Sequence, residues 1–137
     1  MRPMTSADVP ARPLVLVVDD EPFIAHLLAL ALRQEGYDVV TAHGGEEALA
    51  VFGRLPNIAL VIMDLAMDGM AGTQALARMQ EMRPSIRCCF ITGQHDDLLD
   101  EELLRRGGAA VIRKPFDLAG IGGAIRQWLS PPAGTTG

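Results

Sequence analysis

Five short segments rich in apolar residues recur along the chain, separated by stretches of mixed polarity. Continuous apolar runs of this length are typical of strands buried on both faces of a parallel sheet. The run at 58–63 has no polar side chain and fits the centre of such a sheet, whereas 37–42 has mixed polarity and fits its edge. The pattern predicts strands at 14–18, 37–42, 58–63, 86–92 and 109–113.

The segments between these strands carry apolar residues at spacings of three and four, which indicates helices. Pro22 suits the first turn of the first helix, and Gly36 suits a left-handed cap at its end. Pro84 closes the third helix, and Asp117 can cap the last one. We expect helices from 22 to near 36 and at 46–55, 73–83, 96–106 and 117–129.

Two of these helices carry broad apolar stripes. In the first, Phe23 and Leu30 widen the stripe, and we assign them to the core, with a partner surface as the alternative. In the third, Leu76, Met79 and Met82 form one face. A methionine stripe of this kind is more often core than a cofactor site. Both stripes are therefore expected to be buried.

Strands that alternate with helices form a doubly wound parallel sheet with right-handed crossovers. The predicted fold is α/β, a (βα)5 arrangement with a five-stranded parallel sheet in the flavodoxin-like order 2-1-3-4-5 and helices on both faces. The chain has 137 residues, of which 49% are hydrophobic, enough for one core. We expect one domain at 14–130 between flexible tails at 1–13 and 131–137.

Charge and composition argue against several classes of protein. Lys and Arg number 12 against 17 Asp and Glu, and the net charge of −5 argues against nucleic acid as a direct partner. The apolar runs are far shorter than the roughly 20 residues of a membrane helix, and residues 1–13 resemble neither a signal peptide nor an anchor. We therefore expect a cytoplasmic protein without membrane contact. Cys88 and Cys89 are neighbours in one predicted strand, so they should face opposite sides of the sheet as reduced thiols.

Polar residues stand where four of the predicted strands end. Asp19 and Asp20 follow the first strand, Asp64 follows the third, Thr92 ends the fourth and Lys114 follows the fifth. Parallel strands end at the same edge of a sheet, and ligands bind at the carboxyl edge of open α/β sheets. We expect these side chains to converge on one site.

The charges of this cluster indicate its chemistry. Two carboxylates about 4 Å apart repel each other by roughly 1 kcal/mol in water-like surroundings and by about 4 kcal/mol near a protein surface. Three acids need a counter-charge, and oxygen ligands without histidine or cysteine suit Mg²⁺, which binds few carboxylates together with waters and phosphate oxygens. Phosphoryl transfer onto a carboxylate is the matching reaction, with Asp64 as nucleophile and Asp19 and Asp20 as metal ligands. Lys114 and Thr92 would stabilise the transferred oxygens.

Four motifs carry these residues: the acid pair follows VLVV, Asp64 stands in VIMDLAMDGMAG, Thr92 in FITG and Lys114 in RKPF. Together they resemble the response-regulator receiver domains of two-component signalling, over residues 14–130. The resemblance implies that Asp64 receives a phosphoryl group from a histidine of a sensor kinase or of a histidine phosphotransfer domain. It also implies that the carbonyl of Ala66 completes the Mg²⁺ shell, and that a protein target recognises the fourth helix, fifth strand and fifth helix.

The chain departs from the family pattern at several positions. Family members switch through the hydroxyl at the Thr92 position and an aromatic residue on the fifth strand, where this chain has Val111. Valine has no ring to move, so we expect a smaller rearrangement, or one carried by the loop after Thr92 and the helix from 96. The positions that tune phosphoryl lifetime carry Ala66 and Gln94, which predicts a longer-lived acyl phosphate. Asp68 replaces the usual proline and still suits a turn.

Other functions stay open. Val111 leaves room for a phosphorylation-independent interaction module that keeps the fold, and a purely structural acid cluster is a further alternative. An aspartate-based phosphatase of another α/β family fits less well, because such enzymes place a second acid two residues after a nucleophile on the first strand. We expect a signalling phosphoacceptor with at most self-catalysed phosphotransfer and dephosphorylation. The kinase, the target, phosphorylation-dependent dimerisation, and whether the chain stands alone or belongs to a longer protein are undecided.

Overall fold

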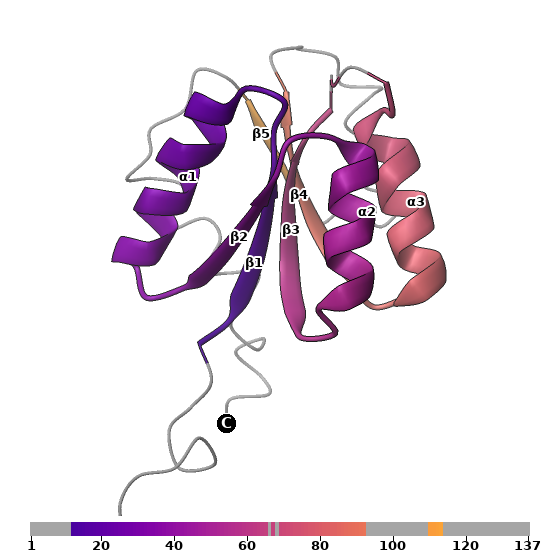
Figure 1. Cartoon of the computed structure of the whole chain (residues 1–137), viewed down its shortest axis with the longest axis horizontal. Helices are drawn as coiled ribbons and strands as arrows, with labels where there is room; N and C mark the ends of the chain where they lie inside the picture. The colour runs from indigo at the N-terminus through magenta and orange to yellow at the C-terminus, as the bar shows by residue number, and fades with distance from the viewer. Residues whose placement is uncertain (1–11, 66, 68, 93–109, 114–137) are drawn as a thin grey trace, which may run out of the picture.

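The computed structural model describes residues 12–65, 67, 69–92 and 110–113. Its elements are β1 (Leu14–Val18), α1 (Pro22–Gln34), β2 (Asp38–Ala42), α2 (Gly45–Arg54), β3 (Ile58–Asp64), α3 (Gly72–Met82), β4 (Arg87–Thr92) and β5 (Ala110–Arg113). The strands form a parallel sheet in the order β2-β1-β3-β4, with β5 hydrogen-bonded alongside β4 (Figure 1). The predicted parallel α/β class is confirmed. The helices predicted at 96–106 and 117–129 lie outside the described residues.

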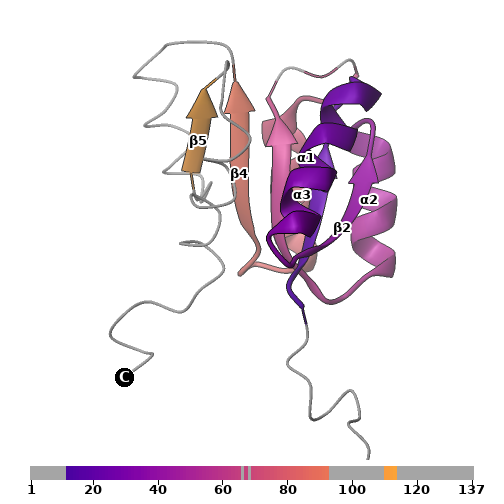
Figure 2. The same cartoon turned by 90° about the vertical axis from the view of Figure 1, so that its left-hand side faces the viewer.

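All strands point the same way, so their carboxyl ends share one edge of the sheet (Figure 2). β2 lies at the side of the sheet, as its mixed polarity predicted. Helices α2 and α3 each begin and end one residue earlier than predicted, and β2, β4 and β5 each begin one residue later. None of the helices in the described part of the chain has the length and apolarity that a bilayer-spanning segment requires.

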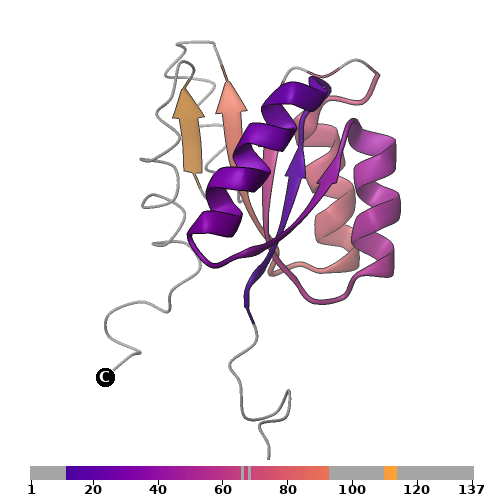
Figure 3. The same ribbon diagram turned by 60° about the vertical axis from the view of Figure 1, so that its left-hand side comes forward.

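Helices cover both faces of the sheet. α1 packs on one face, and α2 and α3 pack on the other (Figures 1 and 3). Cys88 belongs to the core cluster on the α2–α3 side and Cys89 to the cluster on the α1 side, which confirms that the two thiols face opposite ways. Burial raises the pKa of Cys88 well above its ordinary value, with a contribution from Cys89, and burial raises the pKa of Cys89 to about 12. Both thiols therefore stay protonated in the core.

Helix α1 begins and ends as its sequence predicts. Pro22 stands in its first turn, where a missing N–H loses no hydrogen bond. At the other end Gly36 adopts a φ of 96°, the left-handed conformation that favours glycine. The Gly36 N–H donates to the Arg33 carbonyl and the Tyr37 N–H donates to the Leu32 carbonyl, so the last turn closes as a Schellman motif.

Three apolar residues assigned to the core are in fact exposed. Phe23 is 69% exposed and Leu30 is 42% exposed on α1, and Met82 is 51% exposed at the end of α3. The assignment was wrong because a helix on a sheet buries one stripe, and periodicity does not show which of two neighbouring stripes faces inward. On α1 the buried residues are Ala25, Leu28, Ala29 and Leu32.

Arg83 holds together the opposite, amino edge of the sheet. One terminal nitrogen of its guanidinium donates to the carbonyls of Phe52 and Leu55 at 2.7 and 2.9 Å. The other donates to the carbonyls of Pro56 and Ile58 at 3.1 and 3.3 Å. The guanidinium carbon also lies 3.7 Å from the centre of the Phe52 ring, a cation–π contact. One side chain thus ties the end of α2 and the start of β3 to the end of α3.

Candidate functional site

Asp19 follows β1 and is fixed by two hydrogen bonds. Its N–H donates to the Ala42 carbonyl at 3.1 Å, which continues the pairing of β1 with β2 past the end of the strand. Its carboxylate is buried, and Oδ1 accepts a hydrogen bond from the Glu21 N–H at 2.9 Å. This bond fixes the turn that leads into α1. Asp20, in the same turn, is half-buried.

Asp64 is the last residue of β3 and is only 5% exposed. β1 and β3 are neighbours in which Val18 pairs with Met63, so Asp19 and Asp64 stand at equivalent positions on adjacent strands. Carboxylate oxygens of Asp19, Asp20 and Asp64 all lie within 4.8 Å of one another. The structure therefore brings together three acids that are far apart in the sequence.

The donor set of this cluster fits a hard divalent cation. Each residue offers a carboxylate oxygen, the ligand type that Mg²⁺ prefers, and two oxygens on opposite sides of a Mg²⁺ ion are about 4 Å apart. Oxygens within 4.8 Å of one another can therefore share one ion directly or through a shell water. A cation at this position would also relieve the mutual repulsion of the three charges.

Thr92 reaches the same edge from the next strand. It is the last residue of β4 and is 3% exposed. Asp64 pairs with Ile91, and the Leu65 N–H donates to the Ile91 carbonyl at 3.0 Å, so Thr92 stands one position beyond the partner of Asp64. Thr92 in turn pairs with Arg113 on β5. Lys114, the next residue, lies outside the described residues, as do Ala66, Asp68 and Gln94.

Val111, the position where the family pattern has an aromatic residue, pairs with Phe90 on β4. Its side chain is half-buried and packs against the core cluster on the α2–α3 side. Phe90 itself is fully buried in that cluster. The large side chain at this level of the sheet is therefore on β4, and the small one is on β5.

Sequence reasoning missed the contact between the two loops beside the acids. Gly45, the first residue of α2, is covered by Met70 from the loop between β3 and α3. These residues border a cavity of about 590 Å³ that Gln74 also lines. The glycine pair before α2 was visible in the sequence, but nothing in the sequence shows which loop lies over it.

Comparisons with known proteins agree with the fold. A family model for the response regulator receiver domain matches residues 15–126. The transcriptional regulatory protein GlrR of Escherichia coli (strain K12) is 37% identical over 123 residues, which are 89% of this chain and 27% of that protein. The chain thus spans about a quarter of the length of that relative.

Two further proteins are matched over nearly their whole length. Sporulation initiation phosphotransferase F of Bacillus subtilis (strain 168) is 31% identical over 116 residues, which are 84% of this chain and 92% of that protein. A crystal structure of the CheX-CheY-BeF3-Mg+2 complex from Borrelia burgdorferi contains a chain that is 29% identical. The two superpose with a TM-score of 0.82 over 87% of this chain and 90% of that one. On the family match and this near-complete coverage, the chain belongs to the response regulator receiver domain family.

Proposed function

We propose that this receiver domain accepts a phosphoryl group from a phosphohistidine onto Asp64, with Mg²⁺ bound by the carboxylates of Asp19, Asp20 and Asp64. The observation that carries the proposal is the grouping of three carboxylates within 4.8 Å at the carboxyl edge of the sheet. Membership of the family supports the class of function, because receiver domains are signalling phosphoacceptors rather than enzymes with a turnover substrate. The domain would extend over 14–130 as a complete (βα)5 fold and act in the cytoplasm.

The reaction is an in-line displacement at phosphorus. A carboxylate oxygen of Asp64 attacks, the new O–P bond forms as the P–N bond to the donor imidazole breaks, and the electron pair of that bond returns to the imidazole nitrogen. Mg²⁺, when bound, would neutralise charge on the carboxylates and on the phosphoryl oxygens. Because Asp64 is buried at the end of a central strand, little side-chain freedom is lost when it is positioned for attack.

Two residues from the neighbouring strands would bind the transferred group. We assign the Thr92 hydroxyl to one phosphoryl oxygen, and the support for this is its place one residue beyond the β4 partner of Asp64. We assign the Lys114 ammonium to another, because Lys114 follows Arg113, which pairs with Thr92. The Ala66 carbonyl, two residues after Asp64, is proposed as a further ligand of the metal.

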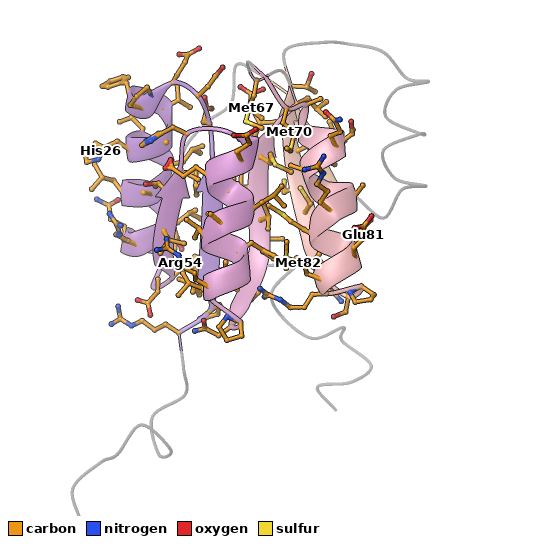
Figure 4. The ribbon with its side chains drawn as sticks, turned by 45° about the vertical axis from the view of Figure 1, so that its right-hand side comes forward. His26, Arg54, Met67, Met70, Glu81 and Met82 are labelled. Atoms are coloured by element: carbon orange, nitrogen blue, oxygen red, sulfur yellow. The ribbon has the colours of Figure 1, made fainter. Side chains whose placement is uncertain are left out.

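The exposed apolar stripe of α1 is the proposed docking surface for the histidine-bearing partner, a sensor kinase or a phosphotransfer domain. Phe23 lies two residues beyond Glu21, whose N–H binds Asp19, and is mostly exposed. Leu30 is seven residues further along and so lies on the same side of the helix. His26, between them, also points outward (Figure 4). The signal would pass on through contacts with a protein target, and dimerisation on phosphorylation is one form that these contacts can take.

The experiment that tests the acceptor uses acetyl phosphate as a small phosphodonor. The chain is incubated with acetyl phosphate and Mg²⁺ and then measured by intact mass spectrometry. We expect one phosphoryl adduct, which is absent in Asp64→Asn and absent when EDTA removes the metal. An adduct that persists in Asp64→Asn would show that another residue is the acceptor. A chain that stays unmodified by both acetyl phosphate and a phosphorylated histidine protein would instead be a phosphorylation-independent interaction module.

Val111 bears on how the signal is transmitted. Its side chain already packs against the core, and a β-branched residue has little χ1 freedom. We therefore expect beryllofluoride with Mg²⁺ to shift the amide resonances after Thr92 more than those around Val111. A two-dimensional amide spectrum with and without beryllofluoride measures this, and a large rearrangement centred on Val111 would contradict it.

A further inference from the structure

The loop that follows Asp64 is tied down at both ends. At its start the Leu65 N–H donates to the Ile91 carbonyl at 3.0 Å, and at its end the Gly72 N–H donates back to the Leu65 carbonyl at 3.2 Å. Gly72 also approaches the strand closely, because a Cβ on it would lie 2.7 Å from the Asp64 carbonyl oxygen. These contacts hold the two ends of the loop together next to the proposed phosphoacceptor.

Met70, in the second half of the loop, contacts a different element. A Cβ on Gly45 would lie 2.8 Å from Cβ, 2.9 Å from Sδ and 3.0 Å from Cγ of Met70. Met70 is therefore in direct contact with the first turn of α2, and only glycine leaves space for it. Figure 4 shows Met70 near the upper ends of α2 and α3. Another side of Met70 borders the open cavity of about 590 Å³, which gives the loop no such support.

The neighbouring glycine provides a contrast. Gly44 has a φ of −179°, extended backbone that any residue adopts. Apart from Gly44 itself and its two chain neighbours, no residue in the described part of the chain has an atom within 4 Å of the place where its Cβ would be. Gly44 and Gly45 are neighbours at the start of α2, yet only a Cβ at position 45 would meet the loop after Asp64. The requirement for glycine at position 45 therefore comes from Met70 and not from the backbone of α2.

We infer that the contact between Met70 and Gly45 is a positioning device for the phosphoacceptor site, one that holds the loop after Asp64 against the first turn of α2. In this assignment Met70 provides no ligand to the metal and no hydrogen-bond donor to the phosphoryl group. It acts through the backbone of the loop, which carries the Ala66 carbonyl. The inference rests on the proposed function, since the loop matters to chemistry only if metal and phosphoryl group bind beside it.

The test compares Gly45→Ala with the matched control Gly44→Ala. In Gly45→Ala the new methyl displaces Met70, and we expect Mg²⁺ to bind about ten-fold more weakly by calorimetry, as when other supports of a metal ligand are lost. In the metal-free protein, the Gly72 amide should exchange with solvent about ten-fold faster, because its bond to the Leu65 carbonyl opens more often. In Gly44→Ala both quantities should stay within about two-fold of the wild type, apart from a small loss of helix capping.

A second pair of variants keeps the test decisive if Gly45→Ala does not fold. Met70→Ala removes the contact without a clash and should show the same two changes, whereas Met70→Leu retains an apolar side chain over Gly45 and should restore both. If the wild type binds Mg²⁺ but Gly45→Ala and Met70→Ala bind it equally well, this inference is wrong and the proposed function stands. If the wild type binds no Mg²⁺, the proposed function fails, and the exchange rate of the Gly72 amide still decides whether Met70 holds the loop.

Discussion

Charged side chains have different surroundings at the two edges of the sheet. At the amino edge, the guanidinium of Arg83 donates to four carbonyl oxygens and lies over the ring of Phe52, so the chain itself satisfies that charge. At the carboxyl edge, Asp19, Asp20 and Asp64 bring carboxylate oxygens within 4.8 Å of one another, and like charges accumulate there. The amino edge therefore stabilises the fold, whereas the carboxyl edge is the one to which the proposed function assigns a cation and a phosphoryl group. Under that proposal, stability and ligand binding depend on opposite ends of the same strands.

The largest effect should come from removing Arg83. In Arg83→Ala the carbonyls of Phe52 and Leu55 lose a charged donor, and we expect the free energy of unfolding to fall by about 3 kcal/mol. Arg83→Lys keeps the charge without the planar fork and should lose roughly half as much. Urea unfolding measures both losses. If the edges are independent, the Mg²⁺ affinity of the folded variants stays at the wild-type value, and a large drop in that affinity would contradict the separation.

The next effect tests the other edge. Mg²⁺ at 100 times its dissociation constant should raise the free energy of unfolding of the wild type by about 2.7 kcal/mol. Asp20→Asn should lose most of this gain, and in EDTA it should be as stable as the wild type or about 1 kcal/mol more stable, because one repelling charge is gone. The matched control is Asp38→Asn, an exposed acid at the start of β2, which should keep the full gain. If Asp38→Asn lost as much of the Mg²⁺-dependent stabilisation as Asp20→Asn, the net charge of the protein, and not the cluster, would determine the response to Mg²⁺.

The sequence predicted the carboxyl edge far better than the amino edge, and the reason is physical. Asp64 could be placed because an unbroken apolar run fixes where a buried strand ends, and the ends of parallel strands meet. Arg83 gave no such signal, because its partners are carbonyls, which every residue has, and they lie up to 31 residues away in the chain. The contact of Met70 with Gly45 was missed for the same reason, since it joins two loops that no local pattern connects. Phe23 and Leu30 were misplaced because helical spacing shows that a stripe exists and not which way it faces.

A substitution in the exposed apolar stripe of α1 should slow phosphotransfer from the partner protein and leave both edges of the sheet unchanged. Phe23→Ala is expected to slow phosphotransfer from a phosphorylated histidine protein by about ten-fold, the loss that removal of one well-packed aromatic contact brings to an interface. Its phosphorylation by acetyl phosphate should stay at the wild-type rate, and its stability should change by no more than about 0.5 kcal/mol. Met82→Ala, another exposed apolar residue, serves as the control and should change neither rate. If Phe23→Ala slows phosphorylation by acetyl phosphate as much as phosphotransfer from the histidine protein, Phe23 belongs to the acceptor site itself.

The smallest effect concerns how long the carboxyl edge retains its phosphoryl group. Hydrolysis of an acyl phosphate needs a water held in line with the O–P bond, and the methyl group of Ala66 offers that water no hydrogen bond. Ala66→Asn supplies an amide at the same position, so we expect the phosphoryl group on Asp64 to be lost a few-fold faster than in the wild type. The measurement is the decay of label after the free phosphodonor is removed, with Arg83→Lys as a control that weakens only the amino edge and should leave the decay unchanged. Slower decay in Ala66→Asn would contradict this account of the lifetime, and faster decay in Arg83→Lys would show that the two edges are coupled after all.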